Sequence, residues 1–169
     1  MEGLKAGTLR GPRVWLVPYT AAFVPQYNEV LRDPLLQQQT ASEPLSLSQE
    51  YLLCAELAQR PHSLTLVLVE AGAPHLMVGD VHVHVAAREP HVAEVDVMVA
   101  APAARRRGFA TEALQLLMPA CEAALGVRRW VARIKDDNEP SLALFARLGF
   151  VEVERSEVFC EVSLEKVVP

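Results

Sequence analysis

The chain has 169 residues, a net charge of −5 and 51% hydrophobic residues, which together are typical of one domain with a sizeable core. The acidic balance argues against a nucleic-acid-binding protein, which needs a basic surface. No run approaches the ~20 apolar residues that cross a bilayer, so no membrane association is expected. Residues 1–13 also lack the apolar stretch of a signal peptide.

The first half of the chain predicts one strand and two helices. Residues 13–18 alternate in character and predict a short strand. Helical spacing then begins at Thr20, the expected N-cap, and ends at Asp33. A second amphipathic helix follows, with Ser46 or Ser48 as its N-cap.

The second half of the chain predicts mainly strands, separated by two helices. Strands are expected over residues 64–69, 76–86, 91–99, 130–134, 150–153 and 158–164, and helices over 109–125 and 140–148. Pro119 lies inside the longer helix and should kink it. The order β-α-α-β-β-β-α-β-α-β-β predicts a mixed α/β (α+β) fold around a central sheet, with residues 1–169 as a single domain.

The three cysteines, Cys54, Cys121 and Cys160, are far apart in the sequence. Their spacing fits no Cys-x-x-Cys metal site, and an odd number cannot complete a disulfide framework. We therefore expect core cysteines, no metal cofactor, and a reducing cytoplasmic or nuclear compartment.

An arginine-rich loop joins strand 91–99 to the long helix, with the sequence Arg105-Arg106-Arg107-Gly108-Phe109-Ala110. Unpaired amides at a helix N-terminus attract anions, and glycine lets the backbone approach a ligand closely. The loop has neither the Lys-Ser/Thr of a Walker A loop nor the GxGxxG dinucleotide fingerprint. It is a candidate pyrophosphate cradle, although a solvated basic turn would have the same sequence.

A second motif follows about thirty residues later, where the segment from Asn138-Glu139-Pro140-Ser141 runs into Leu148-Gly149-Phe150. Taken with the R-x-x-G-x-A loop, this segment resembles the GCN5-related N-acetyltransferases over nearly the whole chain. The resemblance implies an acyl-CoA N-acyltransferase fold, acetyl-CoA as cosubstrate, and acetyl transfer to an amine.

A narrower resemblance concerns residues 14–20, which are similar to the ribosomal-protein and amino-terminal acetyltransferases. Residues 40–45, 49–51, 77–81 and 138–141 are similar, more narrowly, to the N-acetyltransferase 9 branch. That branch implies a protein acceptor, at a lysine or an N-terminal amine, with tubulin as a candidate substrate or partner.

The family resemblance also implies which residues contact the coenzyme. The strand end would pair with pantetheine, the loop would bind the pyrophosphate, and Asn138 would bond the pantetheine arm or simply cap its helix. The expected coenzyme contacts are Val97, Met98, Val99, Arg105, Arg106, Arg107, Gly108, Phe109, Ala110, Thr111, Asn138, Ser141 and Phe145.

Acetyl transfer requires a neutral amine, so a carboxylate must accept a proton. Glu94 and Asp96 project from one face of their strand, and two carboxylates there could raise each other's proton affinity. The resemblance favours Glu94, while an exposed strand face is the simpler alternative. Many members of the family protonate the leaving thiolate with a tyrosine in the last helix. This chain has Phe145 at that position, so either no protein acid is used, or Ser141 or a water substitutes.

Direct attack in a ternary complex is expected, because no serine or cysteine has a recognisable nucleophile setting. The resemblance places Thr40, Ser42 and Glu43 near the acceptor amine, with a plain loop as the alternative. His82 and His84 could join the two carboxylates if the strand register allows it. The sequence leaves open two other functions: a coenzyme-binding module that stabilises a protein partner such as microtubules, and a small-amine acetyltransferase.

Overall fold

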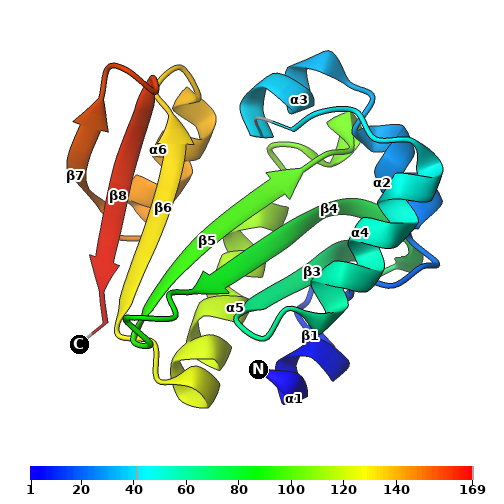
Figure 1. Ribbon diagram of the computed structural model, residues 1–169, viewed down its shortest axis with the longest axis horizontal. Helices are drawn as coiled ribbons and strands as arrows, with labels where there is room; N and C mark the ends of the chain where they lie inside the picture. Colours follow the sequence, from blue (N-terminus) through cyan, green and yellow to red (C-terminus); the bar gives the residue numbers. More distant parts are fainter. Residues whose placement is uncertain (41, 169) are drawn as a thin grey trace.

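The computed structural model describes residues 1–40 and 42–168 as an eight-stranded mixed sheet with helices on both faces (Figure 1). The strands are β1 (Leu9–Arg10), β2 (Val14–Pro18), β3 (Ser63–Glu70), β4 (Ala73–Val85), β5 (Val92–Val99), β6 (Arg129–Lys135), β7 (Val151–Ser156) and β8 (Glu161–Val167). The helices are α1 (Glu2–Ala6), α2 (Val24–Val30), α3 (Pro34–Thr40), α4 (Leu47–Gln59), α5 (Phe109–Leu125) and α6 (Glu139–Arg147), with a 3-10 turn at Pro102–Ala104. None of the described helices is long and apolar enough to span a membrane.

The strand order in the sheet is β1-β2-β3-β4-β5-β6-β8-β7. Every neighbouring pair is antiparallel except β5 and β6, which run parallel. The mixed α/β fold and the predicted order of its elements are confirmed, with α1, β1 and α3 in addition. The turn between the last two strands lies later than predicted, so Val158 falls in this turn and is 85% exposed.

The helix starts show how local chemistry sets the element boundaries. Ser46 caps α4 through a capping box with Gln49, as one of the two predicted alternatives requires. The N-cap predicted at Thr20 is wrong, because α2 begins at Val24, after a turn in which the Phe23 amide bonds the Thr20 carbonyl. A turn there leaves Pro25 in the first helical turn, where its missing N–H costs little.

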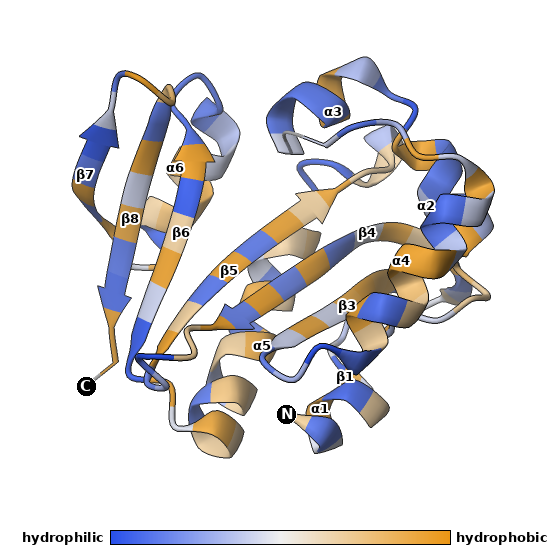
Figure 2. Ribbon diagram, viewed as in Figure 1, coloured by the Kyte–Doolittle hydropathy of each residue, from blue (hydrophilic) through white to orange (hydrophobic). Residues whose placement is uncertain are grey.

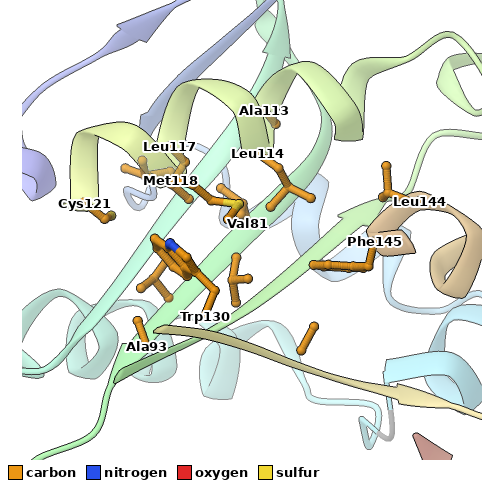
Figure 3. Packing of buried hydrophobic residues seen from close by; sticks show 14 of the residues in the cluster. Val81, Ala93, Ala113, Leu114, Leu117, Met118, Cys121, Trp130, Leu144 and Phe145 are labelled. Atoms are coloured by element: carbon orange, nitrogen blue, oxygen red, sulfur yellow. The ribbon is translucent and has the colours of Figure 1, made fainter. Parts of the chain in front are cut away.

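The main core lies between the sheet and α5, which covers one face (Figures 1 and 3). The buried side of α5 consists of Phe109, Ala113, Leu114, Leu117, Met118 and Cys121. Trp130 is fully buried against this side and donates its indole N–H to Glu122 at 2.9 Å. Pro119 lies inside α5 on its exposed side, so water can solvate the carbonyl of Gln115 that proline leaves without a donor.

The opposite face of the sheet is covered only in part, by α2 and α4. A second core cluster lies beneath these helices and includes Tyr19, Val24, Cys54 and Val67. Figure 2 shows hydrophobic and hydrophilic residues alternating along β4 and β5. One side of these strands therefore faces the α5 core, while the polar side turns toward the partly covered face.

Candidate active site

Strands β5 and β6 diverge, and this divergence creates the central feature of the site. They pair only at their starts, where Val92, Ala93 and Glu94 lie opposite Arg129, Trp130 and Val131. Beyond Glu94 the edge of β5 that faces β6 has no partner strand among the described residues. An extended ligand can hydrogen-bond to such an edge as an added strand would. Val97, Met98 and Val99 lie on this unpaired part of β5.

A row of free backbone amides lies where the β5 segment turns into α5. No described residue accepts a hydrogen bond from the backbone N–H groups of residues 106–111. The first amides of an α-helix have no partner within the helix, and they carry the positive end of its dipole. Consecutive amides of this kind form an anion site suited to a diphosphate.

The loop conformation depends on two residues with left-handed backbone geometry. Gly108, the residue before α5, has φ +82°, and Arg106 has φ +60°. The Arg13 guanidinium lies beside Gly108 and donates a hydrogen bond to the Arg107 carbonyl at 3.0 Å. This hydrogen bond ties the loop to Arg13 and occupies the Arg107 carbonyl oxygen.

Arg13 is itself held by Glu112, in the first turn of α5. The Glu112 carboxylate accepts hydrogen bonds from the Arg13 amide at 2.8 Å, the Arg13 Nε at 2.6 Å and the Val14 amide at 3.0 Å. Burial alone would raise the pKa of Glu112, but these hydrogen bonds and the charge of Arg13 outweigh it and lower the pKa. The sequence reasoning missed both residues, because neither stands in a motif.

The side chains of two loop arginines are occupied by protein groups. Arg105 donates to the Val99 and Ala100 carbonyls, both at 3.1 Å, and lies 3.7 Å from Asp33. Arg107 pairs with Glu70 at 2.6 Å and stacks over Phe109. The expectation that both guanidinium groups face the diphosphate therefore lacks support, while their amides remain available. Arg106 is exposed and has no hydrogen bond or ion pair among the described residues.

Helix α6 follows the diverging end of β6. Asn138 caps this helix, its Oδ1 accepting the Ser141 amide at 3.3 Å, which is the structural alternative considered for this residue. Phe145 is only 3% exposed and lies within the core (Figure 3). Its ring packs edge-on against Phe150. Its contact with a pantetheine arm stays a prediction, and in this structure Phe145 is a core residue.

Polar side chains cross the partly covered face of the sheet in two rows. The register places His82 opposite Asp96, and His84 opposite Glu94, so all four share one face. On the far side the His82 ring bonds the Thr65 hydroxyl at 2.8 Å, and the His84 ring bonds the Ser63 hydroxyl at 3.1 Å. The register therefore allows the polar cluster that the sequence left open, and each row runs hydroxyl, imidazole, carboxylate.

The two carboxylates of β5 differ in their surroundings. Glu94 forms an ion pair with Arg133 of β6. The side chain of Asp96 is exposed and has no hydrogen bond or ion pair among the described residues. The protein around Asp96 desolvates it and, with the charges of Glu94 and Glu161, raises its pKa to about 6 against the opposing effect of Arg133. Asp96 is therefore ionised, yet able to accept a proton, near neutral pH.

The predicted acceptor residues lie at the rim of this region. Thr40 ends α3, and its hydroxyl bonds the Leu36 carbonyl and the Ser42 hydroxyl, both at 2.7 Å. Glu43 is exposed, and Ala41 lies outside the described residues. In Figure 1, α3 stands near the end of β5, across from β6 and α6. This position is compatible with an acceptor role for Thr40, Ser42 and Glu43, which stays a prediction.

The cysteines contribute nothing to this site. All three are free; Cys54 and Cys121 are buried, as the sequence predicts. The expectation of a core position is wrong for Cys160, which is exposed in the turn between β7 and β8, with φ +49°. Among the described residues, no three histidine, cysteine or acidic side chains come together as a metal ion would require.

The chain matches the family model described as "Acetyltransferase (GNAT) domain" over residues 13–151. It is 39% identical to the "N-acetyltransferase 9-like protein" of Nematostella vectensis, covering 93% of this chain and 84% of that one. It is 38% identical to the "Alpha/beta-tubulin-N-acetyltransferase 9" of Mus musculus, covering 95% of this chain and 70% of that one.

Solved structures show the same fold at low sequence identity. The ribosomal L7/L12 alpha-N-protein acetyltransferase superposes with a TM-score of 0.83 at 16% identity, covering 96% of this chain and 94% of that one. The spermidine N-acetyltransferase of Vibrio cholerae, solved with CoA and spermine, gives 0.82 at 15% identity, covering 93% and 96%.

Proposed function

Because this chain belongs to the GNAT acetyltransferase family and is an N-acetyltransferase, we propose that it transfers acetyl from acetyl-CoA to an amine of tubulin. The amine is an α-amino group or a lysine side chain. Two observations support this proposal: the free amides of residues 106–111 on the coenzyme side, and the tubulin acetyltransferase names of relatives at 37–38% identity. Tubulin as the acceptor implies action in the cytoplasm.

The amide row carries the coenzyme part of the proposal. The N–H groups of residues 106–111 would donate to the pyrophosphate oxygens, and Gly108 allows the left-handed turn that exposes them and the close approach of the Arg13 guanidinium, which a Cβ would meet. The backbone of Val97 and the amide of Val99, on the unpaired edge of β5, would hold the pantetheine arm by hydrogen bonds, while the Val99 carbonyl is occupied by Arg105. The thioester would then lie near Met98, with Asp96 two residues away on the same strand.

Within this arrangement Asp96 is the better candidate for the general base. An acceptor amine with an ordinary pKa of ~8 to 10 is mostly protonated at neutral pH and must lose a proton before it attacks. Asp96 has a pKa of about 6 and no competing partner, while Glu94 is held by Arg133. We therefore place Asp96 ahead of Glu94, reversing the order that the family resemblance favours.

The amine attacks the thioester directly, without an acyl-enzyme, because no cysteine lies at the site. Helix α6 presents no tyrosine hydroxyl to the leaving thiolate, since Phe145 occupies that position and is buried. The half-buried Ser141, in the first turn of α6, carries the hydroxyl nearest to Phe145 in sequence.

Calorimetric titration with acetyl-CoA tests the coenzyme site, using Gly108→Glu and a matched control, Gly126→Glu. Both glycines have left-handed backbone geometry and flank the same helix, at φ +82° and +70°. Only Gly108 adjoins the amide row, so Gly108→Glu should abolish binding, because the new side chain would meet the Arg13 guanidinium and displace the loop that Arg13 holds, while Gly126→Glu should retain it. Unchanged affinity in a folded Gly108→Glu protein would refute the site. Mass spectrometry of tubulin incubated with wild type and acetyl-CoA then identifies the acetylated amine.

A further inference from the structure

An ion pair between Glu94 and Arg133 bridges β5 and β6 at the point where the two strands separate (Figure 1). The ladder between these strands ends at Glu94 and Val131. Arg133 lies two residues further along β6, and its guanidinium reaches across the gap to the Glu94 carboxylate. Both side chains are partly exposed, so the pair adds little to stability and calls for another explanation.

The divergence of the strands determines which carboxylate Arg133 binds. Continued by two residues, the register of β5 and β6 would place Asp96 opposite Arg133, but the strands separate first. On the other side of Arg133 lies Ser163 of β8, and Glu154 of β7 lies opposite Ser163. A cavity of about 240 Å³ is lined by Glu94, Arg133 and Glu154. Of these carboxylates only Glu94 is paired with Arg133, so Asp96 is left free.

This pairing sets the charge that surrounds Asp96. Glu94 and Asp96 lie two residues apart on one face of β5, and unpaired carboxylates in such an arrangement oppose each other's ionisation. The guanidinium of Arg133 stays positively charged throughout the pH range of a folded protein. Bound to Glu94, it cancels the charge of that carboxylate and leaves Asp96 as the free negative charge of the strand.

The other groups around Asp96 do not supply a positive charge. Besides Glu94 and Arg133, the titratable groups that face Asp96 come from β4 and β8: Asp80, His82, His84 and Glu161. Burial lowers the pKa of His82, the residue directly opposite Asp96, so its ring carries little charge at neutral pH. Among the described residues, Arg133 is therefore the cation that opposes the neighbouring acids.

We infer that Arg133 is a positioning residue of the acceptor site: by holding Glu94 across the gap between the strands, it keeps Asp96 unpaired and ionised for the arriving amine. Arg133 acts through Glu94 and Asp96 and needs no contact with the substrate. The inference rests on the proposed function, because it takes Asp96 as the base.

The acidic limb of the kcat/KM profile, measured with acetyl-CoA and tubulin, tests this role. Arg133→Gln removes the positive charge, so the limb should move to higher pH by about half a unit, the size expected for a partly exposed charge. Glu94→Gln removes the neighbouring negative charge and leaves Arg133 without its partner, so the limb should move to lower pH. Arg133→Lys keeps the charge and should keep the limb. The matched control Arg155→Gln breaks an exposed ion pair on β7 and should leave the limb in place.

An NMR titration of ¹³C-labelled aspartate carboxyls measures the same shifts without turnover. The Asp96 signal is identified by its loss in Asp96→Asn. The inference is overturned if neither the Asp96 pKa nor the limb moves in Arg133→Gln, or if Arg133→Gln only melts lower than wild type.

The two readouts also separate this inference from the proposed function. If Asp96→Asn removes the limb while Arg133→Gln leaves it in place, the inference fails and the assignment of Asp96 as the base stands. If the NMR pKa of Asp96 moves in Arg133→Gln while the limb does not, Asp96 is not the base, and the proposed chemistry fails together with the role of Arg133. If tubulin is not acetylated, the NMR titration alone decides whether Arg133 controls the ionisation of Asp96.

Discussion

Replacement of Glu112 by glutamine tests whether the coenzyme loop depends on a buried charge. Glu112 has a side chain 9% exposed and joins the start of β2 to the first turn of α5 through three hydrogen bonds. Glutamine has nearly the same size but a single acceptor oxygen and no charge. At least one N–H would therefore lose its partner, and Arg13 would lose its counter-ion.

The cost follows from these contacts. Hydrogen bonds to charged groups contribute about 1.5–3 kcal/mol each, but Arg13 is 57% exposed, so water screens its share. We expect Glu112→Gln to lower the free energy of unfolding by about 2–3 kcal/mol at pH 7, or the melting temperature by roughly 4–12 °C. The control Glu122→Gln lies in the same helix and can still accept the Trp130 indole N–H, so it should lose less than about 1 kcal/mol.

The pH dependence gives the decisive measurement. The pKa of Glu112 is lowered from 4.5 in the folded protein, so the ionised carboxylate stabilises the fold above that pH. This stabilisation is lost as the pH falls through the lowered pKa, which glutamine does not share. Urea unfolding between pH 3 and 8 should therefore show the two proteins converging at acid pH. An equal difference at pH 3 and pH 7 would refute a role for the charge.

Two other substitutions have defined outcomes. Asp96→Asn should lower kcat/KM by about 10²- to 10⁴-fold. It should also remove the acidic limb near pH 6 from the pH profile of wild type, because the carboxylate accepts a proton only above its raised pKa of about 6. An unchanged pH profile would exclude Asp96 as the base. Gly79→Ala should destabilise the fold by about 1–3 kcal/mol and weaken acetyl-CoA binding, because a Cβ would push the Met98 backbone away. Thermal melting measures the first effect and calorimetry the second. Gly72→Ala, where a Cβ has open space, is the control.

The sequence predicts those parts of the fold that local chemistry determines. Helix α5 begins and ends where the spacing and Gly126 place it, and the capping box at Ser46 starts α4. The sequence does not predict α3, because Asp33-Pro34 is also the signal for a helix end. The same pair also starts the next helix, since the Asp33 carboxylate accepts the Leu35 amide at 2.9 Å and proline is favoured at that position.

The site could be predicted only in outline, because its details depend on contacts between distant segments. Asp80 alternates with valines and is indistinguishable in sequence from an exposed strand residue, but α2 covers it. Glu70, from β3, occupies Arg107, and Arg13, from the start of β2, lies beside Gly108. No pattern within the loop itself contains this information.

The two halves of the site consequently place different demands on the sequence. The coenzyme side needs only a particular backbone conformation, which the left-handed φ angles of Gly108 and Arg106 provide. The amides that bind the anion can belong to residues of any type. Acetyltransferases of low identity can therefore share that side of the fold. The acceptor side instead depends on a particular side chain, Asp96, whose replacement changes the charge that an amine meets. Substrate choice in this chain should therefore depend on the covered face of β4 and β5, and acceptor preference should change there before coenzyme binding does.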